Sequence, residues 1–163
     1  MAFERALELQ PDNADAGNSL GALLAQSGEV PAAIERFRAA LKVKPDFPDA
    51  LNNLGFALFQ TGQADQAHDL YQKALKLQPD FPEALNNLGI FFGRQGDLDR
   101  ALGYFRQAVD KRASYGEAAN NLALVLAARG DTEEAVAVLR RLLQENPGFE
   151  MAYVTLSRIY LKA

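Results

Sequence analysis

Residues 48–81 read PDALNNLGFALFQTGQADQAHDLYQKALKLQPDF, and the next 34 residues open with the closely similar PEALNNLG. In the first of these stretches, apolar residues recur at helical spacing on both sides of Gly62. They are Leu51, Leu54, Ala57 and Leu58 before it, and Ala67, Leu70, Tyr71, Ala74 and Leu75 after it. Glycine supplies the permissive backbone that a tight turn between two helices requires. The stretch therefore predicts a pair of antiparallel helices.

The same pattern returns every 34 residues along the chain. Leucine followed by a small residue lies at Leu20-Gly21, Leu54-Gly55, Leu88-Gly89, Leu122-Ala123 and Leu156-Ser157. Glycines recur at Gly28, Gly62, Gly96 and Gly130, and large apolar or aromatic residues at Phe3, Phe37, Tyr71, Phe105 and Leu139. One helix pair cannot bury its own apolar face, so its stability must come from stacking on neighbouring pairs. The period predicts an all-α solenoid.

In these columns, and in a late proline at Pro45, Pro79 and Pro147, the sequence resembles the tetratricopeptide repeat. The resemblance covers the whole chain and implies a right-handed α-solenoid of stacked antiparallel helix pairs. By this resemblance, residues 1–163 form one solenoid, with complete repeats at 14–47, 48–81, 82–115 and 116–149. Residues 1–13 then resemble a preceding second helix, and residues 150–163 a following first helix. Ala113, Ala123 and Ser157 depart from the family pattern, which affects local packing.

The two partial repeats predict that the chain is a fragment of a longer protein. Residues 1–10 and residues 150–163 are complementary halves of one repeat. They could pack head to tail between molecules, and such heterologous contacts lead to open assemblies unless they close.

Composition narrows the function classes. The net charge is -4 with dispersed Lys and Arg, which argues against nucleic acid as a partner. There is no cysteine, and the single histidine, His68, excludes a paired-histidine metal site. No apolar run approaches the roughly 18 residues of a membrane span, and no signal peptide opens the chain. We expect a cytoplasmic protein that is not an enzyme and carries no cofactor or metal.

A row of asparagines lies on the first helix of each repeat, on the side that faces away from the apolar packing stripe. At about 100° per residue, Asn52, Asn53 and Phe56 lie about 160–260° from Leu54. The asparagine row consists of Asn18, Asn52, Asn53, Asn86, Asn87, Asn120 and Asn121. A carboxamide offers the donor and acceptor that match the amide of an extended peptide. This row resembles the asparagine ladder of O-GlcNAc transferase-type superhelices, which grips a peptide backbone. The alternative is that each asparagine bonds a neighbouring repeat.

An apolar row accompanies the asparagines on the predicted concave face. It consists of Phe56, Ile90 and Leu124, with Phe59 on its flank. Partly exposed apolar rows of this kind mark interaction sites. The alternative is that these side chains wedge between consecutive first helices.

Acidic residues recur at the helix starts. One row consists of Asp15, Asp49, Glu83 and Glu117, where carboxylates complement the helix dipole. That structural role is favoured over attraction of a basic ligand. Asp97 is interpreted as a helix cap, and Asp131 with Glu134 predicts a capping box.

These features predict a protein-interaction scaffold whose concave groove holds a peptide of a partner protein. Its contacts would be the asparagine row together with Phe56, Ile90 and Leu124. Two alternatives remain: a targeting or regulatory domain of a larger enzyme such as a glycosyltransferase, and an architectural, self-assembling solenoid.

Overall fold

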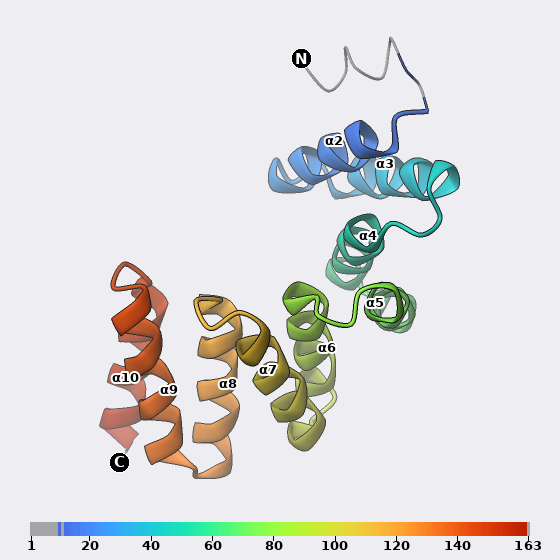
Figure 1. The fold of residues 1–163 in the computed structure, drawn as a ribbon. Coiled ribbons are helices and arrows are strands. Elements are labelled where there is room, and N and C mark those ends of the chain that lie inside the picture. The colour runs from blue at the N-terminus through green and yellow to red at the C-terminus, as the bar shows by residue number, and fades with distance from the viewer. Residues whose placement is uncertain (1–9, 11, 163) are drawn as a thin grey trace. The chain divides into compact units, whose positions relative to one another are not determined.

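The computed structural model describes residue 10 and residues 12–162, and all regular secondary structure in this part of the chain is helical (Figure 1). Its helices are α2 (Ala14–Gln26), α3 (Val30–Val43), α4 (Pro48–Gln60), α5 (Ala64–Leu77), α6 (Pro82–Arg94), α7 (Leu98–Lys111), α8 (Gly116–Arg129), α9 (Thr132–Glu145) and α10 (Glu150–Lys162). Residues 1–9 of the second helix predicted within residues 1–10 lie outside the described residues. None of the described helices is long and apolar enough to cross a bilayer.

The chain divides into two compact units, with the boundary between Pro79 and Asp80. We call residues up to 79 the N-terminal unit and residues from 80 the C-terminal unit. The N-terminal unit holds the antiparallel pairs α2–α3 and α4–α5, and the C-terminal unit holds α6–α7 and α8–α9, followed by α10 (Figure 1). Inside each unit the pairs stack, with α3 against α4 and α7 against α8. First helices also contact each other, as α2 does α4 and as α8 does both α6 and α10.

Glycine makes the turn inside every complete helix pair. Gly28, Gly62, Gly96 and Gly130 have φ between 80° and 92°, the left-handed region that other residues rarely adopt. The amide of the residue that follows each of them donates to a carbonyl in the last turn of the first helix, as Gln63 does to Leu58 at 2.9 Å. The column of mid-repeat glycines therefore sets the hairpin geometry that the sequence predicts.

The predicted caps of α7 and α9 differ in outcome. The Asp97 carboxylate accepts from the Arg100 backbone amide at 3.0 Å, which confirms it as the cap of α7. The capping box of Asp131 and Glu134 is wrong, because Asp131 makes no side-chain cap bond to α9. Arg129 lies 3.5 Å from the Asp131 carboxylate, and Arg106 forms an ion pair with Glu134 at 2.6 Å. Cations from neighbouring helices thus compete successfully for both carboxylates.

The core of each of the first three pairs contains an aromatic ring packed against a glycine. A Cβ at Gly55 would lie 2.7 Å from the Tyr71 ring, and one at Gly89 would lie 2.5 Å from the Phe105 ring. In the fourth repeat the corresponding residues are Ala123 and Leu139, and both are fully buried. A larger residue on the first helix is matched there by a smaller, non-aromatic one on the second. The departure at Ala123 is therefore compensated within its own repeat.

Candidate functional site

The asparagine row forms hydrogen bonds between successive first helices. In the N-terminal unit, Asn53 Nδ2 donates to Asn18 Oδ1 at 3.0 Å. In the C-terminal unit, Asn121 Nδ2 donates to Asn86 Oδ1 at 3.0 Å. Each bond joins residues 35 positions apart, so the second asparagine of one repeat reaches back to the first asparagine of the repeat before it.

Between α8 and α10, a threonine donates the corresponding hydrogen bond. Thr155 Oγ1 donates to Asn120 Oδ1 at 2.7 Å, again across 35 positions. Both side chains are buried. A hydroxyl replaces the carboxamide as donor at this step, in the column of Asn53, Asn87 and Asn121. The preceding residue, Val154, continues the column of Asn52, Asn86 and Asn120. The geometry supports an inter-repeat role for the row, which the sequence left as an alternative to peptide binding.

Burial separates the asparagines into two kinds. Asn52, Asn86 and Asn120 are buried, with 4–7% of their surface exposed. Asn18, Asn53, Asn87 and Asn121 are half-buried at the surface. In the described part of the chain, the carboxamide oxygens of Asn53 and Asn121 accept no hydrogen bond. Asn53 and Asn121 therefore each offer an acceptor to a ligand, while Asn18, Asn86 and Asn120 accept bonds that tie consecutive first helices together.

Asn86 serves a second neighbour besides Asn121. Burial raises the pKa of Tyr115 to about 12, and the Glu83 and Glu117 carboxylates add to the rise. Arg112 and a hydrogen bond to the Asn86 side chain lower that pKa in part. Asn86 thus links α6 to α8 and to Tyr115, directly before α8.

The apolar row is exposed where the sequence places it, with one exception. Phe56 and Leu124 keep 43% and 42% of their surface exposed, and Ile90 is half-buried. Phe59 was expected on the exposed flank, and this is wrong, because the residue is buried. It lies about 140° around the helix from Leu54 against about 200° for Phe56, and so faces nearer the core stripe.

A pocket opens between α2 and α4 in the N-terminal unit. Its volume is about 350 Å³. It is lined by Ala22, Ala25, Gln26, Phe37, Asn53, Phe56 and Gln60. The exposed ring of Phe56 and the half-buried carboxamide of Asn53 therefore border one cavity.

The C-terminal unit has the equivalent pocket between α8 and α10, with a volume of about 330 Å³. It is lined by Leu124, Ala127, Ala128, Thr132, Thr155, Arg158 and Ile159. Three repeats separate the two pockets in sequence, and five lining positions correspond: Ala22 to Leu124, Ala25 to Ala127, Gln26 to Ala128, Asn53 to Thr155, and Phe56 to Arg158. The sequence pattern singled out some of these residues but not the cavity between consecutive first helices.

Two of the four acidic residues at the starts of first helices, Asp15 and Glu83, form ion pairs within their own repeats. Asp15 lies 3.7 Å from Lys44, and Glu83 lies 2.6 Å from Arg112. Each cation also stacks on an aromatic ring, Lys44 on Phe47 and Arg112 on Tyr115. These contacts favour the structural role predicted for the acidic row.

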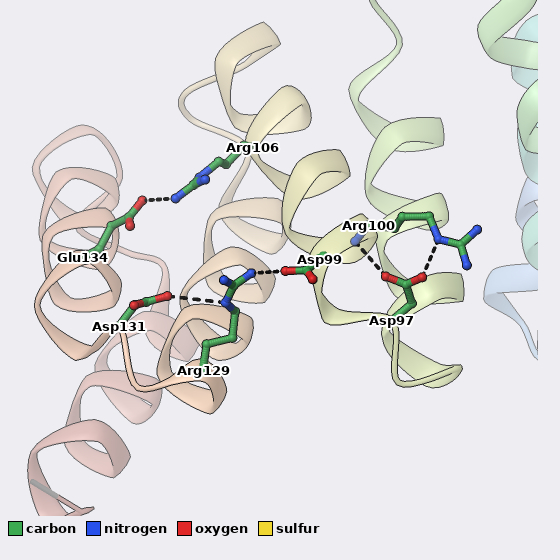
Figure 2. A network of polar contacts seen from close by, with 7 residues as sticks. All are labelled: Asp97, Asp99, Arg100, Arg106, Arg129, Asp131 and Glu134. Carbon is green, nitrogen blue, oxygen red and sulfur yellow. Dashed lines mark hydrogen bonds and ion pairs between the residues drawn. The ribbon is translucent and has the colours of Figure 1, made fainter.

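A polar network not anticipated from the sequence joins α7, α8 and α9 (Figure 2). Arg129, at the end of α8, pairs with Asp99 on α7 and with Asp131 before α9. Arg100 pairs with Asp97 at 2.5 Å and stacks on the Phe92 ring. A hollow of about 700 Å³ lies beside this network. The charged side chains that line it pair with one another, so it is a weaker ligand site than the two apolar pockets.

The chain matches family models of the tetratricopeptide repeat. One model matches residues 2–40, 54–115 and 87–148, and a second matches residues 23–62. Together they cover most of the sequence. Among curated protein sequences, none matches this chain.

Solved structures share the fold at low sequence identity. YrrB, described as a TPR protein with an unusual peptide-binding site, is 22% identical with a TM-score of 0.73, covering 99% of this chain and 84% of its own. A thermophilic TPR protein of Thermus thermophilus is 22% identical with a TM-score of 0.83, covering 98% of this chain and 87% of its own.

The APC/C hetero-tetramer Cut9–Hcn1 contains a chain that is 22% identical with a TM-score of 0.87. That match covers 97% of this chain but 32% of the other, so the likeness concerns a part of a larger protein. Helix pairs of 34-residue period, glycine turns and the family models lead to one assignment. This chain belongs to the tetratricopeptide repeat family.

Proposed function

We propose that this chain binds an extended peptide segment of a partner protein in the pockets between consecutive first helices. Proteins of the family generally mediate protein–protein interactions and are typically non-catalytic scaffolds. The observation that carries the proposal is the recurrence of one pocket at corresponding repeat positions in both units. A cavity that returns with the repeat can take alternate side chains of an extended ligand.

The lining of the pockets suits a peptide. Ligand sites combine apolar walls with a few polar groups that fix orientation. Phe56 and Leu124 supply exposed apolar surface, and the open carboxamide oxygen of Asn53 can accept from a peptide N–H group. Asn121 has an open carboxamide oxygen as well but lies outside the lining of the C-terminal pocket. Ile90 and Asn87 occupy the corresponding columns of the third repeat. Likeness to YrrB, whose description includes a peptide-binding site, accords with this proposal.

The remaining asparagines have an indirect role in the proposal. Asn86 and Asn120 accept from the donors of the following repeat and so fix the distance between consecutive first helices. Asn52 is buried in the same column, and Asn18 accepts from Asn53. The bonds of Asn18, Asn86 and Asn120 hold together the first helices between which the ligand would bind.

Substitution of the exposed apolar residues tests the proposal. Peptides would be selected from a phage-displayed random library on the intact chain, and their affinities measured by fluorescence anisotropy. Each selected peptide should lose about tenfold or more in affinity with Phe56→Glu or with Leu124→Glu, because a buried carboxylate would replace an apolar contact. Both positions are exposed, so the helical circular dichroism should not change.

Leu77→Glu is the matched control. Leu77 is 43% exposed, like Phe56, but lies at the end of a second helix, α5. It should leave every affinity unchanged. Peptides that bind both groove variants as tightly as the wild type, and lose affinity with Leu77→Glu, would show that the site lies on the second helices instead.

A second candidate, self-association, is favoured by α10. Its exposed apolar side chains are Met151, Tyr153, Val154, Tyr160 and Leu161. Apolar groups gathered on one helix favour an additional contact. We propose head-to-tail association of this helix with residues 1–10 of another copy, of which residues 1–9 lie outside the described part. Sedimentation should then show a mass that rises with concentration and falls back with Met151→Glu. A monomer at all concentrations would exclude it.

A further inference from the structure

We infer that the pocket of the C-terminal unit is selective for an acidic side chain of the bound peptide, with Arg158 as the group that recognises it. This inference rests on the proposed function and names the chemistry of one ligand position. It begins from the difference between the two equivalent pockets. Where the N-terminal unit has Phe56, the C-terminal unit has Arg158.

Arg158 is exposed, and among the described residues it forms no ion pair or hydrogen bond. Other arginines of this unit are engaged: Arg129 with Asp99, Arg112 with Glu83, and Arg106 with Glu134. A guanidinium that lines a cavity without a partner can take a carboxylate in a bidentate arrangement.

The rest of the lining contains no opposing charge. Leu124, Ala127, Ala128 and Ile159 are apolar, and the two threonines are neutral. The Thr155 hydroxyl already donates to Asn120 and the Thr132 hydroxyl to the Gly130 carbonyl, at 2.7 and 3.5 Å. Arg158 is therefore the one charged donor of the lining. Apolar walls with a single cation fit a side chain that has a methylene stem and a terminal carboxylate, as glutamate does.

The exposure of Arg158 is a property of its repeat position. Phe56, Ile90 and Leu124 occupy the same position in complete repeats. Phe56 and Leu124 are exposed, and Ile90 is half-buried. A side chain at this position thus keeps part of its surface open to a ligand when the repeat is complete. The net charge of -4 disfavours acidic ligands in general, so a preference for acid must come from this local group.

Two parallel selections on the intact chain test the inference. The same phage-displayed random library would be selected on the wild type and on Arg158→Glu. On the wild type, we expect one peptide position to be enriched in Asp and Glu among the peptides whose binding depends on Leu124. On the Arg158→Glu variant, we expect Lys and Arg at the same peptide position. For one such synthetic peptide, changing its Glu to Gln should weaken binding to the wild type about fivefold to tenfold.

Arg141→Glu is the control for net charge. Arg141 lies on α9 with 70% of its side chain exposed and pairs with Glu145. This variant changes the net charge by the same amount and should keep the acidic preference. Peptides that depend on Leu124 but show no acidic preference would overturn this inference and leave the proposed function standing. Failure to select any peptide would overturn both.

Discussion

Replacing Gly89 by alanine should destabilise the C-terminal unit by about 1–3 kcal/mol, because the new methyl group would overlap the Phe105 ring. A Cβ at this position lies 2.5 Å from one ring atom and 2.6 Å from the next, closer than real contacts allow. Phe105 is itself buried, so the ring can leave only by moving the helix that carries it. Urea unfolding followed by circular dichroism measures the loss.

The chain supplies both a rescue and a control for this variant. The fourth repeat combines Ala123 with Leu139, so Gly89→Ala together with Phe105→Leu should recover part of the stability. Gly103→Ala should instead stabilise by about 0.5–1 kcal/mol, since a helical alanine loses less entropy than glycine. A Cβ at Gly103 would meet nothing within 4 Å. Equal effects of Gly89→Ala and Gly103→Ala would contradict the packing argument.

Replacing Asn86 by alanine should cost about 1–3 kcal/mol, because two polar partners would lose their bonds at once. Asn121 would keep its amide without an acceptor, and Tyr115 would lose its side-chain partner. Asn86 is 4% exposed, so water cannot easily replace either bond. Chemical unfolding of the single variant measures the loss.

A double-mutant cycle separates the inter-repeat bond from the other contacts of Asn86. Asn86→Ala, Asn121→Ala and the double variant should show a coupling of about 0.5–1.5 kcal/mol if the bond contributes to stability. Additive losses would show that this hydrogen bond does not couple the first helices, and ligand binding would then be the remaining role for the asparagine row.

The helix pairs and their turns could be predicted from the sequence because they follow from local chemistry. A glycine every 34 residues fixes each hairpin, and the apolar spacing around it fixes two helices. Asp97 caps α7 as predicted, since its partner lies only three residues away. The Asp131 prediction failed because Arg129 and Arg106, from other helices, decide where the carboxylates of Asp131 and Glu134 point.

The candidate site depends on side chains from different repeats. Sequence spacing could therefore predict the helix face on which it lies but not the contacts between repeats. Phe56 and Leu124 are exposed as the helical arithmetic indicates, but Phe59 is buried because its position borders the core stripe. The bonds of Asn53 to Asn18 and of Thr155 to Asn120 span 35 residues, and only the packing of two helices brings their ends together. The pocket beside Arg158 follows from that packing as well.

The central claim is that ligands bind between consecutive first helices, and site-specific photo-crosslinking tests it most directly. A benzophenone amino acid would be introduced at Phe56, Leu124 or Leu77, three exposed positions, in separate copies of the chain. With a selected peptide bound, we expect crosslinks from position 56 or 124 and none from position 77. Crosslinking from position 77 with none from the other two would contradict the account.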